Sequence, residues 1–259
     1  MNTTRQHRKA RILGMATAAL MMVTVGAQAQ DAAVAPAFDV VEQKIRTLAP
    51  SASTVAISET PVEGLLQAQI NSDIVYVSSD GAYLLQGTLF DIDARVNLTD
   101  QAMSGVRRDV IEAIDDPRQI RFSPEGKPVH SIWVFTDIDC GYCRKLHDEM
   151  DEFLAKGIEV NYLAYPRAGI GSHSYDKYVS VWCADDPQAA LTDAKAGNEP
   201  EPLQCDNPVL EQFELGQQLG VTGTPAIITR NGDLIPGYMQ SEMLRARLDG
   251  LEQQASASP

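Results

Sequence analysis

Cysteine is scarce in this chain of 259 residues and is absent from its first half. The four cysteines are Cys140, Cys143, Cys183 and Cys205, so the N-terminal half has no thiol for a disulfide or a metal site. Only Cys140 and Cys143 have the Cys-x-x-Cys spacing, and no second such pair is present. The sequence therefore lacks the paired motifs of a structural zinc site.

Positive charge is also in short supply. The chain has 21 Lys and Arg against 35 Asp and Glu, which gives a formal net charge of −14. Removal of residues 1–29 would take away four Lys and Arg and no acid, and would leave a net charge of −18. A chain this acidic is repelled by a phosphate backbone, so we expect no nucleic-acid partner.

Long apolar runs are missing except near the start, at residues 12–25. Four basic residues precede this run, and Ala27-Gln28-Ala29 after it has the small-x-small pattern of a cleavage site. The run is shorter than the roughly 20 apolar residues that a retained membrane anchor would need. We therefore predict a signal peptide over 1–29, cleaved near Ala29, and export to an oxidising compartment.

The stretch 132–156 combines a buried strand with a helix that begins at two cysteines. Residues 132–136 form a β-branched and aromatic run, which is typical of a strand covered on both faces. After Cys143, apolar residues recur every three or four positions, as on one face of a helix: Leu146, Met150, Phe153 and Leu154. The pattern predicts one helix from the cysteines to Lys156.

The spacing of Cys140 and Cys143 indicates redox chemistry. Two intervening residues, Gly141 and Tyr142, put both thiols on neighbouring positions of one helical face, where they can form a disulfide. Unpaired backbone N–H groups at a helix start favour a thiolate over a thiol. We therefore predict that Cys140, at the exposed helix start, is the nucleophile and that the more buried Cys143 is the resolving thiol.

Two other interpretations of this pair stay open. The two cysteines could form a static crosslink, although such a crosslink has little need of a helix start. They could also form half of a zinc site with His147, although Cys183 and Cys205 lie too far along the chain for metal-site spacing. We predict no metal and no cofactor.

Residues 30–96 predict a small antiparallel domain without cysteine. An amphipathic helix over 38–48 precedes short strands over 54–58, 65–70, 74–77 and 83–90. So small a unit buries little of its surface alone, and pairing of exposed strand edges between two copies would stabilise it. We predict a dimerisation domain, with a monomeric prodomain as the alternative.

A larger domain is predicted over 118–252, after a linker within 97–117 that contains a helix over 99–114. A strand over 158–165 follows the cysteine helix, and this strand, helix, strand order implies a parallel pair. Helices over 175–184, 187–196 and 209–219 then form an insertion. It contains Cys183 and Cys205, whose bond would close a loop of 22 residues and stabilise the fold by about 3 kcal/mol. A structural role fits them better than a second active pair.

A Thr-Pro step opens the last part of this domain. Proline cannot donate to a sheet ladder, so Pro225 is expected at the head of a strand, and the sequence leaves the Thr224–Pro225 bond open between cis and trans. Asn231-Gly232 predicts a hairpin. Ser241 is expected to cap a final helix, and residues 253–259 predict an unstructured tail.

The order of these motifs resembles the DsbC/DsbG family of thioredoxin-like thiol:disulfide interchange proteins. The matching segments are Phe135-Thr-Asp-Ile, Cys140-Gly-Tyr-Cys143, Tyr165-Pro-Arg167, Trp182-Cys183-Ala184 and Gly220-Val-Thr-Gly-Thr-Pro225-Ala. Residues 76–87 resemble the N-terminal domain of that family. The resemblance implies an α+β fold with a small N-terminal antiparallel dimerisation domain, a linker helix and a C-terminal thioredoxin-like domain with a helical insertion.

The resemblance also implies a function, that of a homodimeric periplasmic protein disulfide isomerase. Its substrates would be misoxidised exported proteins, and a membrane electron donor of the DsbD type would keep Cys140 and Cys143 reduced. Thr224 and Pro225 would line the substrate groove. Cys183 and Cys205 would form a structural disulfide.

One residue departs from the family pattern. Asp139 stands where the family often has Thr, directly before the first cysteine. A carboxylate so close to Cys140 is expected to disfavour its thiolate.

Other functions share the same chemistry or fold. A DsbG-like thiol-protecting reductase or a disulfide oxidase would use the same cysteine spacing, and the tuning residues Gly141 and Tyr142 only suggest an isomerase. A holdase chaperone that binds unfolded clients in the dimer cleft would not need the thiols at all.

Overall fold

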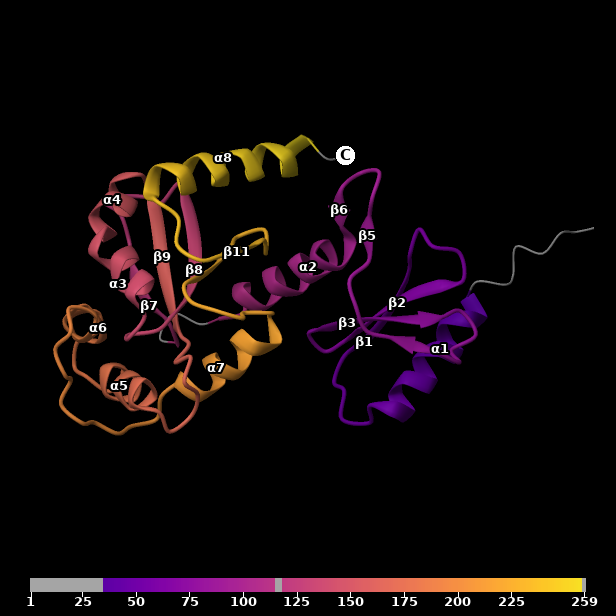
Figure 1. The fold of residues 1–259 in the computed structure, drawn as a ribbon, viewed down its shortest axis with the longest axis horizontal. Coiled ribbons are helices and arrows are strands. Elements are labelled where there is room, and N and C mark those ends of the chain that lie inside the picture. Colours follow the sequence, from indigo (N-terminus) through magenta and orange to yellow (C-terminus); the bar gives the residue numbers. More distant parts are fainter. Residues whose placement is uncertain (1–34, 115–117, 258–259) are drawn as a thin grey trace, which may run out of the picture.

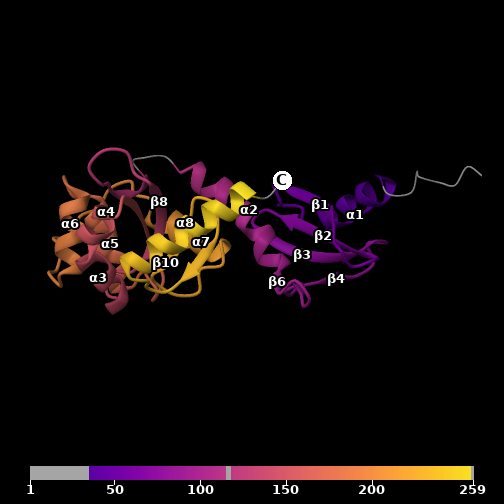
Figure 2. The same cartoon turned by 90° about the horizontal axis from the view of Figure 1, so that it is seen from above.

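The computed structural model describes residues 35–114 and 118–257, so the predicted signal peptide at 1–29 lies outside the described residues. The described chain forms two sheet-containing domains joined by helix α2 (Leu98–Glu112) (Figure 1). Figure 2 shows the same two domains end to end along the long axis. Among the described helices, none combines the length and the apolar character that crossing a membrane requires.

The N-terminal domain is a four-stranded antiparallel sheet with one helix packed on it. Its strand order follows the sequence: β1 (Val55–Glu59), β2 (Leu65–Ile70), β3 (Asp73–Ser78) and β4 (Leu84–Leu85). Helix α1 (Ala35–Leu48) contributes Val41 and Ile45 to a core shared with Ala68 and Val75 of the sheet. The predicted first helix and first three strands are therefore present.

The single strand predicted over 83–90 is wrong. The chain forms two short strands there, and the second, β5 (Phe90–Asp91), pairs with β6 (Val96–Asn97) and not with β3. Gly87 lies between β4 and β5, and a glycine weakens a strand interior. Leu89 N also donates to the Thr99 hydroxyl at 2.8 Å, which draws the chain toward α2.

A buried arginine anchors helix α2 to the larger domain. Arg107 is 4% exposed, and its guanidinium donates to Leu219 O at 3.0 Å and to Asp100 at 2.9 Å. The hairpin turn at Gly232 comes so close that an added Cβ would lie 1.8 Å from Ser104 O of α2. The linker helix is therefore packed on the larger domain.

The larger domain is built on a five-stranded sheet of order β11-β10-β8-β9-β7. The central strands β8 (His130–Thr136) and β9 (Ile158–Ala164) are parallel, as predicted. The other three strands run antiparallel to their neighbours: β7 (Ile120–Phe122), β10 (Ala226–Thr229) and β11 (Leu234–Pro236). Strand β7 is not predicted from the sequence, because three residues are too few to show a period.

Side chains of β8 alternate between two cores. Ile132 and Val134 lie in one core, and Trp133 and Phe135 lie in the other. Helices α2 and α7 cover the second core, and the remaining helices of this domain cover the first. The helices that follow β8 in this domain are α3 (Gly141–Asp148), α4 (Met150–Ala155), α5 (His173–Trp182), α6 (Pro187–Lys195), α7 (Val209–Gln218) and α8 (Ser241–Ala257). Strand β8 is thus covered on both faces, as predicted.

The helix predicted from the cysteines to Lys156 is divided in two. Helix α3 ends at Asp148 and α4 begins at Met150, with Glu149 between them at φ −95° and ψ 15°. Leu146 and Phe153, on either side of the break, are both fully buried. The apolar spacing therefore persists across the break and gives no sign of it.

The unstructured tail predicted over 253–259 is wrong for residues 253–257, where α8 continues to Ala257. Gln and Ala are good helix formers, and neither Gly nor Pro interrupts this stretch before Pro259. Asp249 and Glu252 of α8 also lie 2.7 and 3.2 Å from the ring of His130, which ties the helix to β8. Residues 258–259 lie outside the described part.

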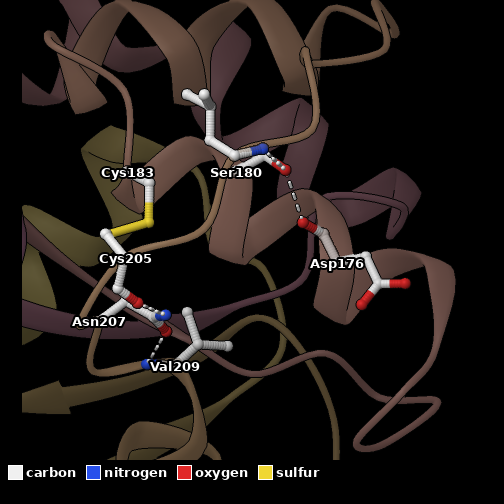
Figure 3. Close-up of a disulfide and its surroundings, with 7 residues drawn as sticks. Asp176, Ser180, Cys183, Cys205, Asn207 and Val209 are labelled. Atoms are coloured by element: carbon white, nitrogen blue, oxygen red, sulfur yellow. Dashed lines mark hydrogen bonds between the residues drawn. A yellow bond between two sulfur atoms is a disulfide. The ribbon is translucent and has the colours of Figure 1, made fainter.

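A disulfide joins Cys183, just after α5, to Cys205, shortly before α7. The chain around it is held by local hydrogen bonds (Figure 3): Ser180 Oγ donates to Asp176 O at 3.0 Å, and Asn207 Nδ2 donates to Cys205 O at 2.9 Å. Asn207 Oδ1 also accepts a hydrogen bond from Val209 N at 3.2 Å. The bond thus fastens the end of α5 to the start of α7 around α6.

Replacing Cys183 and Cys205 together by serine should lower the free energy of unfolding by about 3 kcal/mol, because the denatured chain regains the freedom of a closed loop. Urea denaturation of the wild-type and variant proteins measures this difference. Below the unfolding transition the variant should keep its redox activity, since Cys140 and Cys143 are free thiols outside the loop. An unchanged midpoint would contradict the stabilising role.

Candidate active site

Cys140 occupies the N-cap of helix α3. Its backbone is extended (φ −83°, ψ 122°), and Arg144 N donates to its carbonyl at 3.0 Å in the first turn of the helix. The backbone N–H groups of Tyr142 and Cys143 act on its sulfur and favour the thiolate. The cysteine therefore has the position at the helix start that the sequence predicts.

Cys140 is less exposed than predicted. Only 4% of its surface is accessible, because the loop before β10 covers it and its thiol donates to Thr224 O at 3.3 Å. Cys143 is fully buried, and its sulfur accepts a hydrogen bond from Asp137 N at 3.4 Å. Both are free thiols, so the structure shows the pair in its reduced form.

The two thiols have opposite pKa shifts. Burial raises the pKa of Cys143, and the nearby Lys195 ammonium only partly offsets this effect. Burial also acts to raise the pKa of Cys140, but the nearby Thr224 hydroxyl, the Cys143 backbone and thiol, and the Tyr142 backbone N–H act to lower it and outweigh burial. Cys140 is therefore the thiol better suited to ionise and attack.

Thr224 and Pro225 are joined by a cis peptide bond and face the thiols. The loop is fixed by a hydrogen bond from Gly237 N to Pro225 O at 2.8 Å. Within the part of the chain that the structure describes, the buried Thr224 Oγ1 has no hydrogen-bond partner. Its hydroxyl acts to lower the pKa of both cysteines, so it is a donor available to a thiolate.

Asp139 does not oppose ionisation of Cys140 as expected. Its carboxylate is paired with Arg144 at 3.1 Å and with Lys177 at 3.0 Å. These two cations offset the negative charge beside the cysteine, and the pKa of Cys140 is lowered and not raised. The sequence does not show this compensation, because Lys177 lies 38 positions away from Asp139.

Asp137 is a further site residue, and the sequence gives no sign of its role beyond its place in the Phe135-Thr-Asp-Ile motif. It is 3% exposed, and its carboxylate accepts hydrogen bonds from Ser174 Oγ at 2.6 Å and from Arg167 N at 2.9 Å. Burial acts to raise the pKa of Asp137, but these hydrogen bonds outweigh it and lower that pKa. The buried carboxylate thus ties α5 and the Arg167 loop to the strand end beside Cys143.

A small groove of about 150 Å³ lies along the cis peptide bond, lined by Thr222, Gly223, Thr224, Pro225, Leu234 and Pro236. On the first turn of α3, the side chain of Tyr142 is 65% exposed and its ring stacks on Tyr238 with 6.3 Å between centroids. Backbone-rich and aromatic surfaces of this kind suit an extended peptide.

His147 is not placed to complete a metal site with the cysteines. Its ring nitrogens face Tyr162 OH at 3.3 Å and Thr192 Oγ1 at 3.0 Å, and burial lowers its pKa to about 4. Across residues 35–114 and 118–257, no group of three or more His, Cys, Asp or Glu is arranged to hold a metal ion.

Known proteins share both parts of this structure. Residues 117–252 match a family described as Thioredoxin-like domain, and residues 25–100 match one described as Disulfide bond isomerase protein N-terminal domain. The chain is 39% identical over 202 residues to the thiol:disulfide interchange protein DsbC of Salmonella typhimurium, a match that covers 77% of this chain and 83% of the relative. This chain belongs to the DsbC family.

Two further DsbC relatives are similar over most of their length. The Escherichia coli protein is 36% identical over 225 residues, which is 86% of this chain and 89% of the relative. The Haemophilus influenzae protein is 35% identical over 231 residues, which is 89% of this chain and 95% of the relative. Membership of the DsbC family confirms the predicted α+β fold class with its two domains, and the predicted enzyme class, a protein disulfide isomerase that acts by thiol–disulfide exchange.

The Thr224→Val variant tests the unpartnered hydroxyl. Loss of this donor should raise the pKa of Cys140, so that alkylation below neutral pH slows by about tenfold, the worth of one hydrogen bond to a charged group. The measurement is the rate of iodoacetamide modification of Cys140 against pH. Thr222→Val, an exposed threonine in the same loop, is the matched control and should keep the wild-type profile. Coincident profiles for wild type and Thr224→Val would contradict the assignment.

Proposed function

We propose that Cys140 is the attacking thiol of this DsbC-family isomerase and that exported proteins with wrong disulfides are its substrates. The Cys140 thiolate attacks one sulfur of a client disulfide, forms a mixed disulfide with it, and releases the other client sulfur as a thiolate. That freed thiol then attacks a different client disulfide. The exchange ends when a client thiol attacks the mixed disulfide and releases Cys140. The observation that supports this role best is the lowered pKa of Cys140 beside a buried thiol of raised pKa.

Cys143 releases the enzyme from client proteins that fail to rearrange. Its sulfur attacks Cys140 in the mixed disulfide, which frees the client as a dithiol and leaves Cys140 and Cys143 oxidised. Isomerisation needs the reduced pair, so a thiol donor must restore it. In our proposal this donor is a membrane reductase of the DsbD type, in keeping with the predicted signal peptide and export to the periplasm.

Thr224, Pro225, Gly141 and Tyr142 form the client-binding surface in this proposal. The groove along the cis peptide bond lies next to the Cys140 thiol, which donates to Thr224 O. Gly141 and Tyr142 are both exposed on the first turn of α3, so a client bound at Cys140 would contact them. Cys183 and Cys205 serve only to stabilise the fold.

The N-terminal domain supports a homodimer. Its last strands expose an apolar surface made of Tyr83, Leu84, Leu85, Phe90, Ile92 and Val96. Strand β4 is the edge of the sheet, so its free backbone groups can pair with a second copy. A dimer would cover this surface and leave the thiol sites of both subunits free.

Isomerase activity of the Cys140→Ala variant tests the proposal. We expect reactivation of a scrambled, disulfide-bonded client such as ribonuclease to fall to the uncatalysed rate, because no thiolate remains to start exchange. Cys143→Ala is the matched control: it should still attack and should accumulate mixed disulfides with the client. Full activity of Cys140→Ala would contradict the attacking role of Cys140 and favour the holdase alternative. Wild-type protein that acts only on reduced client would favour an oxidase.

A further inference from the structure

Lys195 is a buried lysine close to the active site that the mechanism above does not use. It lies at the end of α6 and is 2% exposed, in a fold where other lysines reach solvent. Its Nζ donates to Thr136 Oγ1 at 2.8 Å and lies 5.3 Å from the centre of the Tyr162 ring. Among the described residues, no carboxylate lies within ion-pair distance of this ammonium. A buried charge without a carboxylate partner is costly, so its position calls for an explanation.

Thr136 connects Lys195 to Cys143. The Thr136 hydroxyl accepts the hydrogen bond from Lys195 Nζ at 2.8 Å, and the same hydroxyl acts to lower the pKa of Cys143. Cys143 is therefore held among groups that would stabilise a negative sulfur: the Asp137 N–H, the hydroxyls of Thr136 and Thr224, and the Lys195 ammonium. The strand end, α6 and the cis loop together provide this setting.

Other charged or titratable groups also face Lys195. They are Asp137 on the strand end, Cys140, Arg144 and His147 on α3, and Tyr162 on β9. The Asp137 carboxylate is already bonded by Ser174 and Arg167, so it does not take up the Lys195 charge directly. The buried thiol of Cys143 is therefore the remaining group that can offset the charge of the buried Lys195 amine.

Burial brings the proton affinities of these two groups together. It lowers the pKa of Lys195 to about 8 and raises the pKa of Cys143. In water the amine would hold its proton far more tightly than the thiol. In the protein, a fraction of Lys195 is therefore a neutral amine near neutral pH. Once the proton has moved, the charges of the Cys143 thiolate and the Lys195 ammonium offset each other.

We propose that Lys195 is a positioning residue for Cys143. Its amine takes up the Cys143 proton through the Thr136 hydroxyl, and the resulting ammonium stabilises the Cys143 thiolate. The Cys143 proton passes to the Thr136 oxygen as the Thr136 proton passes to the Lys195 amine. The Cys143 thiolate then attacks Cys140 in the mixed disulfide, so that the Cys140–Cys143 bond forms and the bond from Cys140 to the client breaks. The client sulfur leaves as a thiolate and takes a proton from water. The client gains the two electrons that the cysteine pair loses.

This inference rests on the proposed roles of Cys140 and Cys143, and a two-step reaction separates the two claims. Reduced enzyme is mixed with an equimolar amount of the aromatic disulfide DTNB, which yields one coloured thiolate when Cys140 attacks and a second when Cys143 resolves the mixed disulfide. Both release rates are followed against pH by stopped flow. Lys195→Met is the test variant, and Lys156→Met, a surface lysine paired with Glu242, is the matched control.

The second release should require higher pH in Lys195→Met. Its pH midpoint should move up by at least one unit, so that the rate at pH 7 falls by about tenfold, while the first release changes little. Lys156→Met should keep both wild-type profiles. Thr136→Val should show the same shift of the second release as Lys195→Met, and Thr136→Ser, which keeps the hydroxyl, should not.

A wild-type pH profile for the second release in both Lys195→Met and Thr136→Val would overturn the role of Lys195 and leave the proposed function intact. Absence of the first release in the wild-type protein would overturn the proposed function itself. If Lys195→Met proves unstable, the pair Thr136→Val and Thr136→Ser still decides the question, because both keep the lysine.

Discussion

The structure depends on the contact between the first turn of α3 and the cis Thr224–Pro225 loop. This contact buries Cys140 to 4% exposure and at the same time surrounds its sulfur with hydrogen-bond donors. Burial alone would make the thiolate less stable, so the donors decide the outcome. Because the loop belongs to β10 and the helix follows β8, the antiparallel pairing of these two strands fixes the geometry of the thiol.

The immediate surroundings of the two cysteines were predictable, because they arise from local sequence. A strand, a Cys-x-x-Cys pair and an amphipathic helix are neighbours along the chain, and their periods of two and 3.6 residues are visible in the residues themselves. The proline before β10 and the hairpin after it are signalled in the same way. What the sequence could not show was the division of the helix at Glu149, since this break leaves the apolar spacing unchanged. The division of the last N-terminal strand had only Gly87 as its signal.

The electrostatics of the site were not predictable, because the groups that set them are distant in sequence. Nothing in the sequence distinguishes Lys195 from any other lysine at a helix end, because its hydrogen-bond partner Thr136 is 59 positions away. From the sequence alone, Asp139 is expected to destabilise the Cys140 thiolate. In the structure, Lys177 and Arg144 pair with Asp139 and offset its charge. Asp137 joins segments 30 and 37 positions further along the chain. The contacts of Ser174, Lys177 and Lys195 depend on how the helices of the insertion pack on the sheet.

The central claim is that Cys140 ionises more readily than a free cysteine. The measurement that tests it most directly is the ultraviolet absorbance of the thiolate as the Cys143→Ala protein is titrated with base. We predict a midpoint for Cys140 below the value of about 8.5 for an unperturbed thiol. A midpoint at or above that value would show that burial outweighs the donors around the sulfur, and would contradict this account of the active site.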